Sequence, residues 1–313
     1  MLVYRVTQPE EQAPARNRVL ADLGAAAGVS DRGLRHARNE DAMALRQVAP
    51  DAVVVAVADG VSASHRPHEA SRAAVDVAVD VLATAVLERA DPVAATRDAV
   101  AAAAAVVATL RRPEDGGTAP ACTFVSAVVT GGRITVGWIG DSRAYWLAGP
   151  GDPPSQCLTT DDTWAGQAVR AGRETPQEAY GDGRAGPLWR WLGADADSEP
   201  AQVTTLDTTG SGTVLLCSDG LWNYLWNSDE LAAVVRQAGD PLKAATVLTE
   251  VALESGGRDN ITAVVVTVPT VDGGAPDRST QVGGSFRKES TIASAWGSTF
   301  AGSESAAVNT AMP

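Results

Sequence analysis

Four aspartates in this sequence lie at or beside the ends of apolar, strand-like runs. Runs rich in valine and isoleucine are typical of buried strands. A carboxylate has no hydrophobic reason to lie at a strand end, which is where a side chain can be aimed most rigidly. These aspartates are Asp59 after 53–58, Asp141 after 134–140, Asp219 after 213–218 and Asp259 before 261–266. Together they indicate a site for hard divalent cations, which prefer carboxylate oxygens.

Taken singly, each aspartate also fits an ordinary turn, because Asp-Gly and Gly-Asp-Ser are common turn sequences. The combination is more specific than any of its members, since a further acid, Asp41, lies upstream in the segment Asn39-Glu40-Asp41. The set therefore predicts a magnesium or manganese hydrolase site.

Strand and helix patterns follow one another in hairpins and clusters, without βαβ alternation. Gly131-Gly132 joins two long strand patterns, which predicts a hairpin. The expected strands are 53–58, 121–130, 133–147, 203–207, 213–217 and 261–268, and the expected helices are 68–89, 92–110, 229–237 and 242–254. This order predicts an α+β sandwich of two packed antiparallel β-sheets flanked by helices.

The 313 residues are long enough for one large domain with a substantial core. We expect an N-terminal extension over 1–23, a single domain over 24–269 and a disordered tail over 270–313. The tail is rich in Gly, Ser, Thr and Ala, and has few large apolar residues to offset the entropy of ordering.

The formal charge of −13 argues against nucleic acid or an anionic membrane as a partner, since both need basic patches. No run of about eighteen apolar residues and no signal-peptide pattern is seen, so a cytoplasmic protein is expected. Cys122, Cys157 and Cys217 lack metal-type spacing and are expected to be buried, inert thiols.

Over roughly residues 24–269 the chain resembles the metal-dependent Ser/Thr protein phosphatases of the PPM or type 2C class, in their bacterial form. The resemblance rests on separated motifs that occur in order. They are Ser30-Asp31-Arg32-Gly33 through Asn39-Glu40-Asp41, Val57-Ala58-Asp59-Gly60, Gly116-Gly117-Thr118, Gly140-Asp141-Ser142-Arg143, Leu158 through Thr163, Leu216 through Leu221, and Arg258-Asp259-Asn260-Ile261-Thr262.

The resemblance implies hydrolysis of phosphoserine and phosphothreonine on proteins by a metal-activated water, in opposition to a Ser/Thr kinase. It implies two Mg²⁺ or Mn²⁺ ions, with a third as a further possibility. The implied ligands are Asp59 bridging both ions, Asp41 and the Gly60 carbonyl on one, Asp219 and Asp259 on the other, and Asp141 with Asp219 on the third. Glu40 and Asn260 would support the ligands from behind, Glu40 by holding metal-bound waters. Asp141 has the alternative role of a turn residue paired with Arg143.

Two positions depart from the family pattern. His36 stands where the family usually has an arginine that grips phosphate, and a neutral imidazole does not reproduce a paired guanidinium contact. Either His36 binds phosphate, Arg35 or Arg38 replaces it, or His36 is a surface residue without a role. His65 is displaced by one position from a histidine able to act as general acid, so its role as proton donor is a hypothesis.

A second class of function is a pseudophosphatase that binds phosphoproteins as a scaffold, which the missing arginine favours. The intact acids Asp41, Asp59, Asp219 and Asp259 argue against it, because a scaffold has no need to gather mutually repelling carboxylates. The expected partners are phosphorylated Ser/Thr proteins and a cognate kinase, and the chain is expected to be monomeric.

Overall fold

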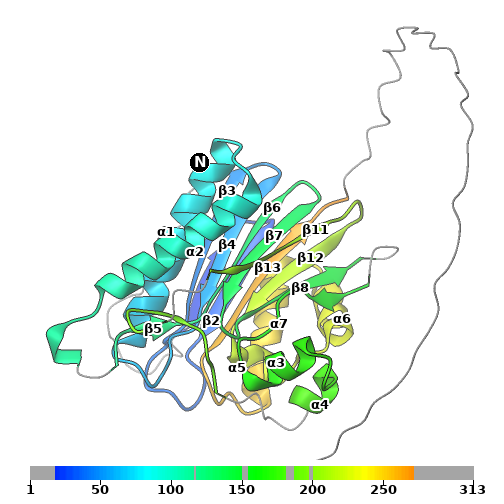
Figure 1. Ribbon diagram of the computed structural model, residues 1–313. Coiled ribbons are helices and arrows are strands. Elements are labelled where there is room, and N and C mark those ends of the chain that lie inside the picture. The colour runs from blue at the N-terminus through cyan, green and yellow to red at the C-terminus, as the bar shows by residue number, and fades with distance from the viewer. Residues whose placement is uncertain (1–17, 116–117, 150–153, 181–186, 197–199, 271–313) are drawn as a thin grey trace, which may run out of the picture. The chain divides into compact units, whose positions relative to one another are not determined.

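Two antiparallel β-sheets packed face to face, with helices over both outer faces, form the fold in a computed structural model of the chain (Figure 1). The structure describes residues 18–115, 118–149, 154–180, 187–196 and 200–270. Apart from residue 270, the expected tail lies outside this range, as do Gly116 and Gly117. The α+β sandwich expected from the sequence is confirmed.

The first sheet has six strands in the order β1-β2-β13-β12-β8-β9, and every neighbouring pair is antiparallel. Its strands are β1 (Arg18–Asp22), β2 (Ala26–Asp31), β13 (Ile261–Val268), β12 (Gly212–Cys217), β8 (Arg143–Ala148) and β9 (Gln156–Cys157). Residues 18–22, placed in the N-terminal extension from sequence, thus form an edge strand paired with β2.

The second sheet has five strands in the order β11-β7-β6-β4-β3, again all antiparallel. Its strands are β11 (Gln202–Asp207), β7 (Arg133–Ile139), β6 (Phe124–Thr130), β4 (Ala52–Ala58) and β3 (Ala42–Ala49), and a small pair is formed by β5 (Ala121–Cys122) and β10 (Leu192–Gly193). The hairpin predicted at Gly131-Gly132 joins β6 to β7.

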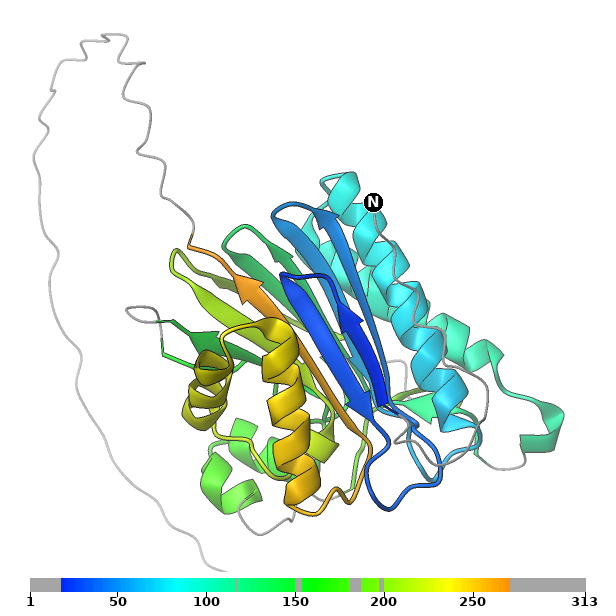
Figure 2. The ribbon, with the colours of Figure 1, turned by 180° about the vertical axis from the view of Figure 1, so that it is seen from behind.

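Helices cover the two outer faces, α1 and α2 on the five-stranded sheet and α6 and α7 on the six-stranded one (Figure 2). The helices are α1 (Pro67–Leu87), α2 (Pro92–Thr109), α3 (Trp164–Arg170), α4 (Pro176–Tyr180), α5 (Asp219–Trp222), α6 (Ser228–Ala238) and α7 (Pro241–Glu254), with a 3-10 turn η1 over Pro113–Asp115. Asp91 and Asp240 cap α2 and α7 through hydrogen bonds to backbone amides, each followed by proline at the first helical position.

Strand β4 shows how its sequence produces this layering. Val53, Val55 and Val57 point into the core between the sheets, whereas Val54 and Ala56 pack beneath α1 and α2. A strand buried on both faces reads as a continuous apolar run, as this one does. Asp59 directly follows this strand, so its position is fixed by a strand that is buried on both faces.

The strand expected over 133–147 is interrupted, because the chain changes sheets between β7 and β8. The crossing occurs at Gly140, whose φ of +99° favours glycine, and a Cβ there would lie 2.7 Å from Thr123 Cβ. Asp141 is consequently part of the turn between the two sheets.

Helix α2 is, among the described residues, the one helix long and apolar enough to span a membrane by length and composition. The same properties occur in the core helices of folded domains, and the buried face of α2, including Ala99, Val100 and Ala103, packs in the cluster shared with α1.

Candidate functional site

Asp41 is buried at the start of β3 and is held by hydroxyls from the facing sheet. Its Oδ2 accepts a hydrogen bond from Ser218 Oγ at 2.7 Å and another from Thr262 Oγ1 at 2.7 Å. Its Oδ1 is also buried but has no hydrogen-bond partner among the residues that the structure describes. One oxygen is therefore fixed by the protein, and the other is available to a ligand.

Behind Asp41 a further polar chain continues into the sandwich. Thr262 Oγ1 lies 2.8 Å from Ser30 Oγ, which accepts from Asn39 Nδ2 at 2.8 Å. These hydroxyls come from β2 and β13, which are neighbours in the six-stranded sheet. This series of hydrogen bonds anchors the loop before β3 to the six-stranded sheet.

Asp59 follows β4, and its backbone is fixed by Thr123. The Asp59 amide donates to Thr123 Oγ1 at 3.2 Å, and the Thr123 amide donates to the Asp59 carbonyl at 2.8 Å. The next residue, Gly60, has no room for a side chain, because a Cβ would lie 2.7 Å from Pro67 Cβ and 2.8 Å from the Glu40 carbonyl oxygen. Close packing therefore explains the glycine after Asp59.

Asp219 begins α5 directly after β12. Its Oδ2 accepts from Asn223 Nδ2 at 3.1 Å, while its buried Oδ1 has no hydrogen-bond partner within the described part of the chain. Asp259 lies just before β13 and is more exposed, and its Oδ1 is 3.2 Å from His36 Nε2. Two strands of the same sheet thus supply this pair of carboxylates.

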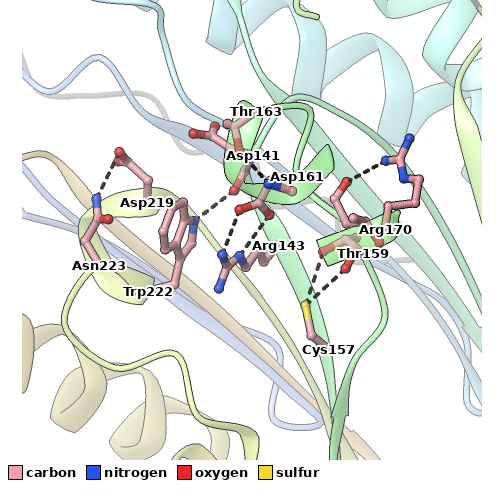
Figure 3. Close-up of polar contacts among 12 residues, drawn as sticks. Asp141, Arg143, Cys157, Thr159, Asp161, Thr163, Arg170, Asp219, Trp222 and Asn223 are labelled. Carbon is pink, nitrogen blue, oxygen red and sulfur yellow. Dashed lines mark hydrogen bonds and ion pairs between the residues drawn. The ribbon is translucent and has the colours of Figure 1, made fainter. Parts of the chain in front are cut away.

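Asp141 lies in the turn between β7 and β8, beside Asp219 and Trp222 (Figure 3). Its backbone carbonyl accepts a hydrogen bond from Trp222 Nε1 at 2.8 Å. The alternative role considered from sequence, a pairing with Arg143, is not what the structure shows, because the Arg143 guanidinium pairs with Asp161 at 2.9 and 2.7 Å.

Burial and mutual repulsion shift the protonation of these acids. Burial raises the pKa of Asp41 to about 7, against the lowering effect of its two hydroxyl donors, and Asp219 and Asp259 raise it further. Burial, followed by the charge of Asp259, raises the pKa of Asp219 to about 6. Burial also raises the pKa of Asp59 and of Asp141 well above the usual range, with neighbouring aspartates adding to the effect.

The chemistry of this donor set fits hard divalent cations, which prefer carboxylate oxygens. Within the described ranges, no three His, Cys, Asp or Glu side chains converge as a closed ligand group. The observation that supports a cation is the pair of buried oxygens, Asp41 Oδ1 and Asp219 Oδ1, to which no described residue donates a hydrogen bond. Mg²⁺ keeps several waters and takes few protein carboxylates, so an open arrangement of this kind suits it.

Glu40 and Asn260 support the site through the backbone as well as through side chains. Asn260 Oδ1 accepts from the Glu40 amide at 2.6 Å, and Asn260 Nδ2 donates to the carbonyls of Arg32 and Arg38 at 2.7 and 3.1 Å. Glu40 Oε2 accepts from Ser62 Oγ at 2.8 Å. Asn260 therefore ties the loop before β3 to the start of β13.

The basic residues considered for phosphate binding and proton donation, His36, Arg35, Arg38 and His65, differ in what they contact. Arg38 Nη1 lies 2.7 Å from His68 Nε2, whereas Arg35 is exposed. His65 is exposed in the loop before α1. It lies near Asp115, whose pKa is lowered first by a hydrogen bond from the Arg112 amide and to a smaller extent by His65. Of these four described candidates, His36 is the one with a contact to a predicted metal ligand, Asp259.

Sequence reasoning missed the hydroxyls of Ser218 and Thr262 and the indole of Trp222. The two hydroxyls lie within the motifs Ser218-Asp219-Gly220 and Asp259-Asn260-Ile261-Thr262, so their positions beside the acids were a usable signal. Cys157, expected to be buried, is exposed, while Cys122 and Cys217 are buried as predicted.

An αββα sandwich with carboxylates gathered at the ends of its strands is the arrangement of the metal-dependent phosphatases. Residues 32–253 match the family described as Protein phosphatase 2C. The chain belongs to this family.

Among curated relatives, the chain is 32% identical over 249 residues to Serine/threonine protein phosphatase PstP of Mycobacterium tuberculosis, covering 78% of this chain and 45% of that protein. It is 26% identical over 243 residues to Serine/threonine phosphatase stp of Listeria monocytogenes, covering 76% of this chain and 93% of that one. The chain thus spans slightly less than half the length of the mycobacterial relative.

Solved structures give the same result. The PPM Ser-Thr phosphatase MsPP of Mycobacterium smegmatis, in complex with cacodylate, superposes with a TM-score of 0.63 at 30% identity, covering 78% of this chain and 97% of that one. The catalytic domain of PstP in complex with two manganese ions superposes with a TM-score of 0.58 at 29% identity, covering 80% of this chain and 99% of that one.

Proposed function

We propose that this chain is a protein phosphatase that hydrolyses phosphoserine and phosphothreonine with two bound Mg²⁺ or Mn²⁺ ions, a third ion being held less tightly. The observation that carries the proposal is a pair of buried oxygens, Asp41 Oδ1 and Asp219 Oδ1, for which residues 18–115, 118–149, 154–180, 187–196 and 200–270 supply no hydrogen-bond partner. A buried acceptor left unpaired costs free energy, which a bound cation would recover. The manganese-bound PstP structure, at 29% identity, supports the same assignment.

The chain's own residues would divide the work as follows. Asp59, Asp41 and the Gly60 carbonyl would hold one ion, Asp59, Asp219 and Asp259 the other, and Asp141 with Asp219 the third. When bound, such ions clamp phosphoryl oxygens and lower the pKa of a bound water, so that hydroxide is available near neutral pH. Ser218 and Thr262 fix Asp41 so that its second oxygen faces the ligand.

Phosphate recognition is assigned to the basic residues of the loop before β3. His36 contacts Asp259, one of the predicted metal ligands, and Arg35 is exposed in the same loop. Arg38 holds His68 through Nη1, and its other guanidinium N–H groups could still reach phosphate. His65 is proposed as the proton donor to the leaving seryl or threonyl oxygen, from the loop that follows Gly60.

The proposed partners are phosphorylated proteins and the Ser/Thr kinase whose action the chain reverses, and the chain is proposed to act as a cytoplasmic monomer. The formal charge of −13 supports a role away from nucleic acid and anionic membranes. The same charge favours substrates with basic residues near the phosphorylated site.

The alternative is a pseudophosphatase that binds phosphoproteins without turnover. The test is phosphate release from a small aryl phosphate and from a phosphoserine peptide, with Mn²⁺ and with Mn²⁺ plus chelator. We expect manganese-dependent release that is lost in Asp219→Asn and retained in Asp98→Asn, a matched change of an exposed acid on α2. Peptide binding without release in the wild type would favour the pseudophosphatase.

A further inference from the structure

A stack of two buried side chains, Arg143 and Trp222, and the partly buried Tyr180 lies behind Asp141. The Arg143 guanidinium, 3% exposed, lies over the Trp222 ring, with 3.8 Å between the guanidinium carbon and the ring centroid. The Tyr180 ring of α4 lies on the same guanidinium at 4.3 Å and meets the Trp222 ring edge to face, with centroids 5.9 Å apart. Such contacts are strongest when the cation is desolvated, as it is here.

The stack is anchored by Asp161. Arg143 Nε and Nη2 donate to the two oxygens of Asp161 at 2.9 and 2.7 Å, and Arg143 Nη1 donates to Tyr145 Oη at 3.1 Å. Both members of the ion pair are almost fully buried. The guanidinium plane is therefore fixed, and with it the ring of Trp222.

The fixed indole directs its only donor at Asp141. Trp222 is 2% exposed, and its Nε1 donates to the Asp141 carbonyl at 2.8 Å (Figure 3). On the other side, the Gly140 amide donates to Asp162 Oδ2 at 3.0 Å, and the Asp162 amide donates to the Gly140 carbonyl at 2.9 Å. The turn that carries Asp141 is thus held at both of its peptide groups.

Trp222 and Asp219 belong to the same short helix, α5. Asp219 is the first residue of the single-turn helix α5 and Trp222 is the last, and Asn223, the next residue, donates to Asp219 Oδ2 at 3.1 Å. The single turn of α5 therefore links Asp219, at its start, to the Asp141 carbonyl, which is bound by Trp222 at its end.

We propose that Trp222 is a positioning residue that sets the placement of Asp141 relative to Asp219, and thereby the affinity of the cation held between them. The inference rests on the proposed metal site. In this role the Trp222 indole does not bind the cation itself. It holds the turn at Gly140 and Asp141, where the chain passes from one sheet to the other.

The test is calorimetric titration of the full chain, stripped of metal, with Mn²⁺. Asp141→Ala serves as the reference that identifies the weaker class of sites. Trp222→Phe keeps an aromatic ring against Arg143 but removes the donor to Asp141. We expect it to weaken that class about threefold to tenfold, the size of one neutral hydrogen bond, and to leave the tighter class unchanged.

Trp146→Phe is the matched control, since Trp146 is fully buried in the core between the sheets. It is expected to lower the unfolding midpoint and to leave both classes of Mn²⁺ site unchanged. Unaltered weak-class affinity in Trp222→Phe overturns the inference, as does an equal loss in both classes. Because the readout is binding, it holds even if the wild type fails to release phosphate, so the two proposals fail separately.

Discussion

His36 Nε2 lies 3.2 Å from Asp259 Oδ1, so the histidine found in place of a phosphate-gripping arginine is in contact with a predicted metal ligand. A guanidinium at this position has five donors in a planar fork, enough to pair with Asp259 and still present N–H groups to a phosphate.

We therefore expect His36→Arg to lower KM for a phosphoserine peptide by about threefold to tenfold, with little change in kcat, because charge-assisted hydrogen bonds are added to bound substrate and transition state alike. Steady-state kinetics at saturating Mn²⁺ measure this. An unchanged KM, together with a large increase in Arg35→Ala or Arg38→Ala, means that a neighbouring arginine already makes the contact.

A second prediction concerns the hydroxyls that hold Asp41. Thr262→Val keeps the shape of the side chain but removes a donor to a buried carboxylate, and should lower the free energy of unfolding by about 1–3 kcal/mol. Thr262→Ser retains the hydroxyl and should recover most of this loss. Urea unfolding of the metal-free variants near pH 7 provides the comparison, and equal stability of Val and Ser variants contradicts the role assigned to the hydroxyl.

The third prediction is a pH dependence. The pKa of Asp41 is raised by burial to about 7 in the folded chain, from an ordinary value of 3.8. Between these values the folded state holds more protons than the unfolded state, so this group's contribution to stability falls as pH rises from about 4 to about 7.

Asp41→Asn removes this titration. The stability of the metal-free wild type relative to Asp41→Asn should therefore fall by on the order of 2–4 kcal/mol across that interval. Urea unfolding in chelator at several pH values gives the difference. A difference that is flat or that grows with pH shows that Asp41 is already ionised at low pH.

The fourth prediction addresses the buried ion pair of Arg143 and Asp161. Arg143→Met leaves the Asp161 carboxylate buried and unpaired, and is expected to cost about 3–5 kcal/mol in unfolding free energy. Adding Asp161→Leu should restore much of the loss, because two apolar side chains can replace a buried pair at low cost. If the double variant is less stable than Arg143→Met alone, the pair is not the source of the penalty.

The aspartates could be predicted from sequence because each lies next to a strand whose apolar run is unambiguous, as 53–58 and 213–218 are. Strand β2 escaped prediction because Ala26–Asp31 is short and built of small residues, without a clear alternation. The single-turn helix α5 is too short to show a helical period.

The contacts that complete the site depend on tertiary structure. Ser218 and Thr262 lie 177 and 221 residues from Asp41 along the chain, and only the face-to-face packing of the sheets brings them together. The change of sheets at Gly140 likewise could not be read from a run that is apolar on both sides of it. Sequence patterns therefore locate the acids, and packing determines which of their oxygens remain free.

Whether these carboxylates hold divalent cations is measured by a calorimetric count of Mn²⁺ bound per chain in wild type and Asp59→Asn. We expect at least two ions per wild-type chain and loss of tight binding in Asp59→Asn. The unfolding midpoint in chelator should be unchanged or raised, because burial and the neighbouring aspartates disfavour ionisation of Asp59 and an amide cannot ionise. No binding by the wild type, or identical binding by both proteins, contradicts the account.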